Sequence, residues 1–326
     1  MRFPKVSFVI CTYNCKDYLK RCLKSIAEQD YPKDKIEIVV SDSYSNDGTI
    51  EVARAYGARV ILTKIRGYME GKGMPKSIGC EKASGEIIII IDSDNKLVEK
   101  DWVKKMVYPL ISDESVNYCI CRMAVVKADN LANQYLSLVG TDPFAIYTSL
   151  DPQISLGGVK LEDKGGYYVY TQKDFLITGG YYLAIRKKTL DEIGGYSRDV
   201  DVAYALAKKG AGKIAIAKNA HLHHLITNGY KDFFRKKIKW GKYYFSNPNL
   251  EREFKWAGKL FGRHGKIRFV YEVANNLLFF PAFLTSLRMI AKDGKKAWVL
   301  HPYMKFGTTL AYIIAYIKSY SHGKKD

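Results

Sequence analysis

Apolar positions in the first third of the chain form short runs that alternate with helical patterns. The runs at 6–10, 36–40, 59–62 and 87–91 have the length and β-branched content of buried strands. The intervening segments carry apolar side chains at helical spacing, over 17–28, 49–57 and 76–83. This alternation predicts an α/β fold with a Rossmann-like, mostly parallel central sheet flanked by helices.

The five isoleucines at 87–91 are the most informative strand. Isoleucine is β-branched and stiff, so such a run predicts a strand buried on both faces. It ends directly at Asp92-Ser93-Asp94. Because ligands of open α/β sheets bind at the carboxyl ends of strands, these carboxylates can hold a divalent cation and, through it, a diphosphate. The alternative for this motif alone is a solvated acidic turn.

Beyond residue 115 the alternation loosens. Residues 140–175 are rich in Gly, Tyr and Asp and predict a long functional loop. Its tyrosines are candidate sugar-stacking faces, namely Tyr167, Tyr168 and Tyr170. A strand over 181–185 and helices from 188 and over 199–209 follow, and a histidine-rich segment then precedes a basic helix.

Charge divides the chain unevenly. The net charge is +19; residues 1–200 hold 28 Lys and Arg against 26 Asp and Glu, and residues 201–326 hold 24 against 7. We therefore expect a domain over 1–230 and a helical, basic C-terminal region over 231–326, whose surface suits an anionic partner.

Apolar runs at 277–284 and 310–317 lie among these basic residues. Basic, apolar and aromatic residues together are typical of a membrane-surface helix, and no zinc-finger or RNA-binding signature is present, so an anionic membrane is favoured over nucleic acid. Each run is shorter than the roughly 20 residues of a membrane span. Plain core helices remain the alternative.

The six cysteines lack the spacing of a metal or disulfide framework, and no signal peptide is recognisable. Reduced thiols favour the cytoplasm. With the basic region, this predicts a cytoplasmic protein peripheral on the inner face of the cell membrane.

Several separated motifs agree in order and spacing. They are found at 9–14, at 42–49, at 83–94, at 178–186 and at Gly194-Gly195-Tyr196. Over residues 5–225 the chain resembles the family 2 inverting glycosyltransferases of GT-A fold. The resemblance implies a nucleotide-diphosphate sugar donor and Mn²⁺ or Mg²⁺.

The resemblance also assigns the donor side. Asp94 would be the direct metal ligand, and Asp92 would share the metal or lie near the ribose. Asp42 would contact the base, although a turn or capping aspartate is the alternative. The remaining candidates for nucleotide-sugar binding are Thr12, Asn14, Lys72, Lys76 and Ser93. Lys76-Ser77 stands where many relatives carry Arg-Asn, and lysine cannot bind a phosphate in a bidentate way.

Inversion needs a base that takes the proton of the acceptor hydroxyl. Asp199 matches that base, and Asp201 matches a later aspartate on the acceptor side, together with Gly179 and Gly180. Arg198 replaces the usual acidic neighbour; a cation there would lower the pKa of Asp199 or face the donor phosphates. The alternative is that Asp199 only begins a helix.

Relatives often place a histidine ligand where this chain has His221, His223 and His224. Imidazole suits Mn²⁺ better than Mg²⁺. Neighbours on an extended segment point to opposite faces, so at most two of the three share one face. His223 is the favoured ligand, with His221 and His224 left open.

The sequence thus predicts a metal-dependent inverting glycosyltransferase. Its donor would be a UDP- or GDP-sugar, and its acceptor a hydroxyl or phosphate of a glycan, lipid-linked saccharide or polyprenyl phosphate at the membrane. A sugar nucleotidyltransferase is one rival, but residues 11–15 lack its Gly-rich, Arg-containing loop. The other rival is a non-catalytic scaffold that binds membrane or nucleic acid.

Overall fold

The computed structural model describes residues 2–65, 73–143, 161–171, 183–209, 213–246, 270 and 273–322. The chain divides into two compact units, the first comprising 1–124 and 148–224 and the second 125–147 and 225–326. Residues 125–147, which the sequence places in the first domain, thus group with the C-terminal region.

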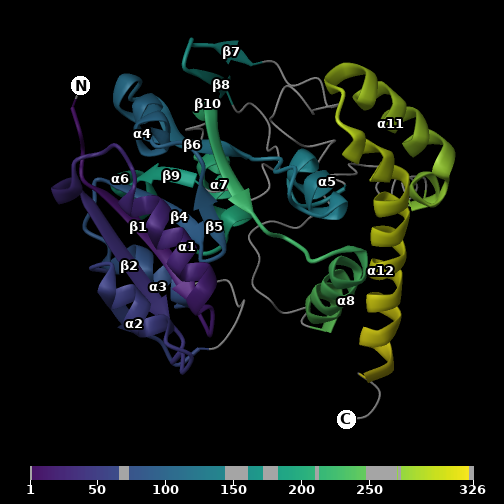
Figure 1. The fold of residues 1–326 in the computed structure, drawn as a ribbon, viewed down its shortest axis with the longest axis horizontal. Helices are drawn as coiled ribbons and strands as arrows, with labels where there is room; N and C mark the ends of the chain where they lie inside the picture. The colour runs from purple at the N-terminus through teal and green to yellow at the C-terminus, as the bar shows by residue number, and fades with distance from the viewer. Residues whose placement is uncertain are drawn as a thin grey trace. The chain divides into compact units, whose positions relative to one another are not determined.

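The first unit begins with alternating strands and helices (Figure 1). These are β1 (Val6–Thr12), α1 (Lys16–Ala27), β2 (Ile36–Asp42), α2 (Thr49–Ala55), β3 (Arg59–Leu62), α3 (Pro75–Lys82), β4 (Ile87–Asp92), β5 (Asn95–Leu97), α4 (Trp102–Ser112) and β6 (Val116–Met123). The rest of the unit contains β7 (Glu162–Asp163), β8 (Tyr167–Thr171), β9 (Leu183–Arg186), α6 (Lys187–Glu192), α7 (Asp199–Lys208) and β10 (Lys213–His224).

The strands of the described residues form one sheet in the order β3-β2-β1-β4-β9-β6-β10-β8-β7, with β5 paired to β10. All neighbours from β3 to β4 are parallel, so the carboxyl ends of β1, β2 and β4 meet at one edge. The other half is mixed, because β9 runs antiparallel to both β4 and β6. The expected α/β architecture is confirmed.

Apolar side chains cover both faces of the sheet, as the isoleucines of β4 illustrate. Ile87, Ile89 and Ile91 belong to one apolar cluster, which also contains residues of α1, α2 and α4. Ile88 and Ile90 belong to a second cluster, with residues of α3, α6 and α7. Successive side chains of a strand point to opposite faces, so an unbroken run of isoleucine serves both layers.

A glycine lets two parts of this core approach closely. A Cβ built on Gly85 would lie 2.6 Å from both the backbone nitrogen and the Oγ of Ser7. The Gly85 N–H donates to that same Oγ at 2.7 Å. Glycine is therefore required here for contact between the α3–β4 turn and β1.

The predicted loop at 140–175 is described at 140–143 and 161–171, and the prediction is wrong for 161–171. This part forms the antiparallel pair β7–β8, and β8 continues the sheet along β10. Tyr167 and Tyr170 are buried at 5% and 9% exposure, so they pack in the core and do not offer stacking faces for a sugar. Tyr168 lies under the ammonium of Lys218, 4.3 Å from its ring centroid.

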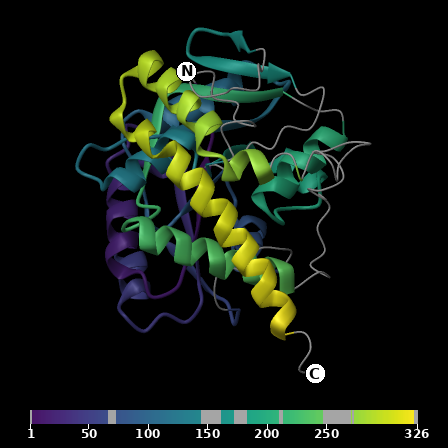
Figure 2. The same ribbon diagram turned by 90° about the vertical axis from the view of Figure 1, so that its right-hand side faces the viewer.

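The second unit is helical in its described residues. It contains α5 (Leu131–Val139), α8 (Tyr230–Ser246), α11 (Phe279–Asp293), the 3₁₀ turn η4 (Lys296–Leu300) and α12 (His301–His322). Its interior includes Tyr135, whose hydroxyl lies 2.7 Å from Nδ1 of the fully buried His301. Figure 2 shows α12 beside α11 and crossing α8. None of the helices within the described ranges has the length and apolar content to cross a membrane.

Candidate functional site

Asp42 lies at the end of β2, directly opposite Thr12 at the end of β1. Its carboxylate is fully buried and accepts from the Thr12 hydroxyl at 2.6 Å, and from the backbone N–H and the hydroxyl of Ser45, each at 2.7 Å. The side chain predicted to contact a base therefore ties the β1 and β2 ends to the loop that follows β2.

Asn14 also connects the loop after β1 to the loop after β2. Its side-chain oxygen accepts from the Asn46 N–H at 3.0 Å, and its own N–H donates to Ser45 Oγ at 2.8 Å. Asn14 and Tyr44 both have positive φ, 44° and 59°. Such conformations are uncommon for residues other than glycine, so the cross-loop hydrogen bonds hold a shape that the backbone alone disfavours.

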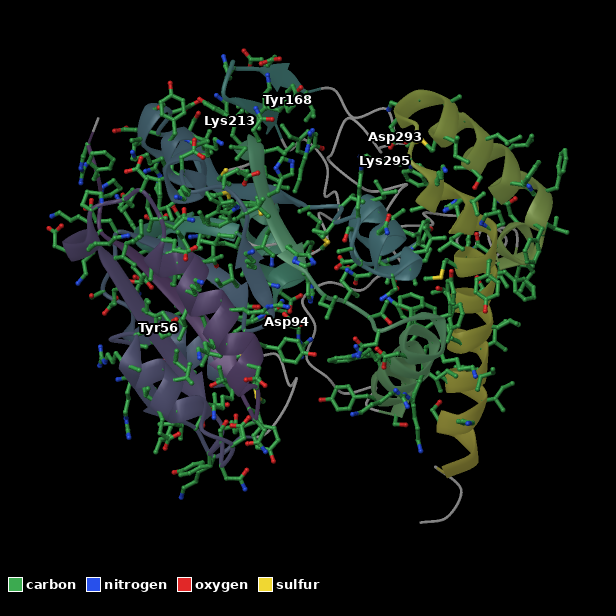
Figure 3. All side chains as sticks on the ribbon, in the orientation of Figure 1. Tyr56, Asp94, Tyr168, Lys213, Asp293 and Lys295 are labelled. Atoms are coloured by element: carbon green, nitrogen blue, oxygen red, sulfur yellow. The ribbon has the colours of Figure 1, made fainter. Side chains whose placement is uncertain are left out.

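Asp92 ends β4, and Ser93 and Asp94 form the turn into β5 (Figure 3 labels Asp94). The fully buried Asn95 orders this turn: its side-chain oxygen accepts from the Asp92 N–H at 2.7 Å, and its amide donates to Asp94 Oδ1 at 3.2 Å. The sequence analysis missed Asn95. An Asn three residues after the strand-ending Asp92 is the signal for a side chain that caps a turn.

Lys76, on the first turn of α3, places its ammonium 2.9 Å from Asp92 Oδ1. Burial alone would raise the pKa of the Asp92 carboxyl, but the charges of Lys76 and His224 outweigh it and hold that pKa below its ordinary value. Asp92 is thus held as a carboxylate, as a cation ligand must be.

Of the three histidines, His224 is the one beside the acidic turn. Its Nε2 lies 3.2 Å from Asp94 Oδ2, because antiparallel pairing of β10 with β5 sets His224 opposite Asn95. His223 pairs with Lys96, and Nδ1 of His221 contacts Glu99 Oε1 at 2.6 Å. The histidines lie on a strand, where the sequence indicated only an extended segment before a helix.

Within the described ranges, no group of three or more His, Cys, Asp and Glu side chains could by itself hold a metal ion. Asp94 and His224 offer one hard oxygen and one imidazole nitrogen, and Asp92 is held by Lys76. Such a donor pair fits a Mn²⁺-type ion whose other positions are filled by water or by a phosphate-bearing ligand.

Among the residues predicted for the acceptor side, Asp201 pairs with Arg198. The guanidinium Nη1 lies 3.9 Å from Asp201 Oδ2, and both side chains are largely buried. Asp199 begins α7, but its side chain lies outside what the structure describes. Lys72, Gly179 and Gly180 also lie outside the described residues.

Residues 7–161 match the family model for glycosyl transferase family 2. Over 102 residues the chain is 32% identical to the poly(ribitol-phosphate) beta-N-acetylglucosaminyltransferase TarS of Staphylococcus aureus, covering 31% of this chain and 18% of that protein. Over 98 residues it is 35% identical to the GalNAc(5)-diNAcBac-PP-undecaprenol beta-1,3-glucosyltransferase of Campylobacter jejuni, covering 29% of this chain and 31% of that protein. The chain thus spans under a third of either relative.

Among solved structures, the chain is similar to the mannosyltransferase PcManGT from Pyrobaculum calidifontis, determined in complex with GDP-Man and Mn²⁺. The TM-score is 0.58 at 18% identity, with coverage of 100% of this chain and 89% of the other. At this identity the likeness shows a shared GT-A fold.

Proposed function

We propose that this chain, whose residues 7–161 match the family model for glycosyl transferase family 2, is a metal-dependent inverting glycosyltransferase. It would move a sugar from a nucleotide-diphosphate donor, UDP- or GDP-linked, to a hydroxyl or phosphate. The acceptor would be a lipid-linked saccharide or polyprenyl phosphate, and the protein would act peripherally on the inner face of the membrane.

One observation carries the proposal: the contact of His224 with Asp94, next to the Lys76–Asp92 ion pair, at the carboxyl edge of the parallel strands. This edge is where open α/β sheets bind ligands. A divalent cation bound by Asp94 and His224 would supply Lewis-acid stabilisation for the charge that grows on the leaving diphosphate. The Mn²⁺ in PcManGT supports this choice of ion.

Donor binding would use the loops after β1 and β2. Because Asp42 and Asn14 hold these loops in one shape, the nucleotide would meet a preorganised surface, which lowers the entropy lost on binding. Lys76, which pairs with Asp92, and Ser93, which follows Asp92 in the turn, would bind the diphosphate. The GDP-Man in PcManGT supports a nucleotide-diphosphate sugar as the donor class.

Asp199 would take the proton of the acceptor hydroxyl, as its match to the family's base implies. A cation at Arg198 would lower the pKa of this base. Arg198 also pairs with Asp201, its Nη1 lying 3.9 Å from Asp201 Oδ2. The undecaprenol-linked acceptor named for the Campylobacter relative supports a lipid-linked acceptor.

The proposal is tested by calorimetric binding of UDP, GDP and CMP, each with and without Mn²⁺. We expect one diphosphate to bind in a Mn²⁺-dependent way, and Asp94→Asn and His224→Gln to abolish this dependence. Asp199→Asn should keep nucleotide binding and lose transfer to a lipid-phosphate acceptor. Absence of nucleotide binding under all conditions would instead favour the non-catalytic scaffold.

A further inference from the structure

Helix α11 of the second unit exposes its largest apolar side chains and buries smaller ones. The residues it buries are small or moderate, namely Ala282, Ser286 and Met289. Large apolar side chains are exposed instead: Phe280 is 69% exposed, and Phe283 and Leu287 are each 49% exposed. A helix that packs on a protein core normally buries its largest apolar residues, so the outer face of α11 suits a second apolar environment.

The exposed residues form one continuous face. Phe280, Phe283, Leu284 and Leu287 are spaced three and four residues apart, the spacing of neighbours along one side of a helix. We call the residues Phe279, Phe280, Phe283, Leu284 and Leu287, all at least 49% exposed, the apolar face.

Helix α12, which packs against α11, repeats the pattern. Its buried residues include Thr308, Ala311 and Ala315, whereas Ile314 and Ile317 are 38% and 61% exposed. Two adjacent helices with the same reversal indicate a shared cause rather than a chance exposure of single side chains.

Basic residues accompany the apolar face. Arg288 and Lys292 are exposed on α11, Lys295 follows in the turn, and Lys296 begins η4. The sole acid of α11, Asp293, accepts from Trp298 Nε1 at 2.9 Å and lies 3.8 Å from the Lys295 ammonium (Figure 3). The described residues from 225 onward contain 12 Lys and Arg against two acids, Asp232 and Asp293.

We infer that the apolar face of α11 is the surface by which this protein docks on an anionic lipid bilayer. The inference deepens the proposed function, on which it rests, by naming the surface that would bring the enzyme to a lipid-linked acceptor. The phenylalanine and leucine side chains enter the boundary between headgroups and acyl chains, and the lysines and arginine beside them meet the anionic headgroups.

This charge pattern selects the bilayer over the other occupants of an apolar face. A second copy of the same surface would bring like charges together around the contact, which disfavours self-association. Nucleic acid would engage the cations but would leave the phenylalanines and leucines in water. An anionic bilayer satisfies both the apolar and the basic residues.

The test is flotation of the full chain with vesicles of phosphatidylcholine alone and of phosphatidylcholine and phosphatidylglycerol in equal parts. We expect binding to the anionic vesicles and weaker binding to the neutral ones. The triple variant Phe280→Gln, Phe283→Gln, Leu287→Gln should bind anionic vesicles about tenfold more weakly, and Arg288→Gln with Lys292→Gln should remove much of the anionic preference. Glutamine favours helix, so these exposed changes leave α11 intact.

Matched controls are exposed residues of the first unit. Leu62→Gln with Val98→Gln replaces aliphatic side chains that are 47% and 48% exposed, and Lys20→Gln with Arg54→Gln removes two exposed charges. Both controls should float like the unmodified chain. Equal flotation of the triple variant and the unmodified chain would overturn the inference, as would failure of the unmodified chain to bind anionic vesicles.

Two further measurements separate the causes of a negative result. Nucleotide binding is measured without vesicles. A chain that binds nucleotide but not vesicles would overturn the docking surface without contradicting the proposed function. The molecular mass in solution is compared for the unmodified chain and the triple variant. A dimer that the triple variant disrupts would overturn the inference in favour of self-association, and salt-sensitive binding to DNA without flotation would overturn it in favour of nucleic acid.

Discussion

His224 Nε2 lies 3.2 Å from Asp94 Oδ2, although 130 residues separate them in the chain. The pairing of β10 with β5 brings them together, and it leaves His223 opposite Lys96. The three histidines therefore differ in their expected contributions to cation binding.

His224→Gln is expected to weaken Mn²⁺-dependent nucleotide binding by about a hundredfold, because it removes a nitrogen ligand beside Asp94. His223→Gln and His221→Gln are the matched controls and should change this binding little. The measurement is calorimetric titration of the nucleotide at fixed Mn²⁺. A large loss in His223→Gln with none in His224→Gln would show that the other histidine is the ligand.

Asp42→Asn is expected to lower the free energy of unfolding by about 1–3 kcal/mol, because an amide NH₂ replaces an oxygen that accepts hydrogen bonds inside the protein. Thr12→Val removes only one of the three donors and should cost less. Urea denaturation of both variants provides the comparison. A base-contacting residue without this structural role would lose nucleotide affinity and keep full stability.

Gly85→Ala is expected to destabilise the first unit by about 1–3 kcal/mol, because the added methyl group meets the backbone of β1. Gly166→Ala serves as the control: its Cβ would lie 3.7 Å from the Tyr108 ring, an ordinary contact. Chemical denaturation should separate the two alanine variants. Equal midpoints would show that β1 can move away from the α3–β4 turn at little cost.

His301 makes the stability of the second unit depend on pH. Burial, with the nearby charge of Lys305, lowers the pKa of His301 to about 3. An unfolded histidine has a pKa of about 6.5, so between these values the unfolded chain binds a proton that the folded chain does not. Stability contributed by neutral His301 is therefore lost as the pH falls from about 6.5 towards 3, by at most about 1.4 kcal/mol per pH unit.

The check is urea denaturation of the unmodified chain and of His301→Gln from neutral to mildly acidic pH. Tryptophan fluorescence monitors the unfolding. Glutamine can still pair with Tyr135 but does not titrate. The difference in unfolding free energy between the two proteins should shrink as the pH falls. A difference that stays constant would mean that His301 does not titrate in this window.

Much of the first unit could be predicted because its signals are local. The strand at 59–62 matches β3, and the expected helix at 76–83 differs from α3 by one residue at each end. An unbroken isoleucine run and a following acidic pair identify a buried strand and its carboxyl end without any knowledge of partners.

What could not be predicted depends on pairing between distant segments. The choice among the histidines follows from the register of β10 against β5, and the role of Asn95 follows from the turn that it caps. Tyr167 and Tyr170 resembled loop residues, because the strand that buries them, β10, lies more than 40 positions further on. The reversed face of α11 is likewise invisible until its buried side is known.

Strand β10 is irregular where it pairs with β6. Between Ile216 and His221 the strand gains residues relative to its neighbour β6, and Asn219 there adopts a positive φ of 54°. A single residue inserted at this bulge would slide the end of β10 by one place and set His223 where His224 now stands. Two histidines in tandem thus give the strand a second imidazole, so that lengthening the chain at this point need not erase the imidazole beside Asp94.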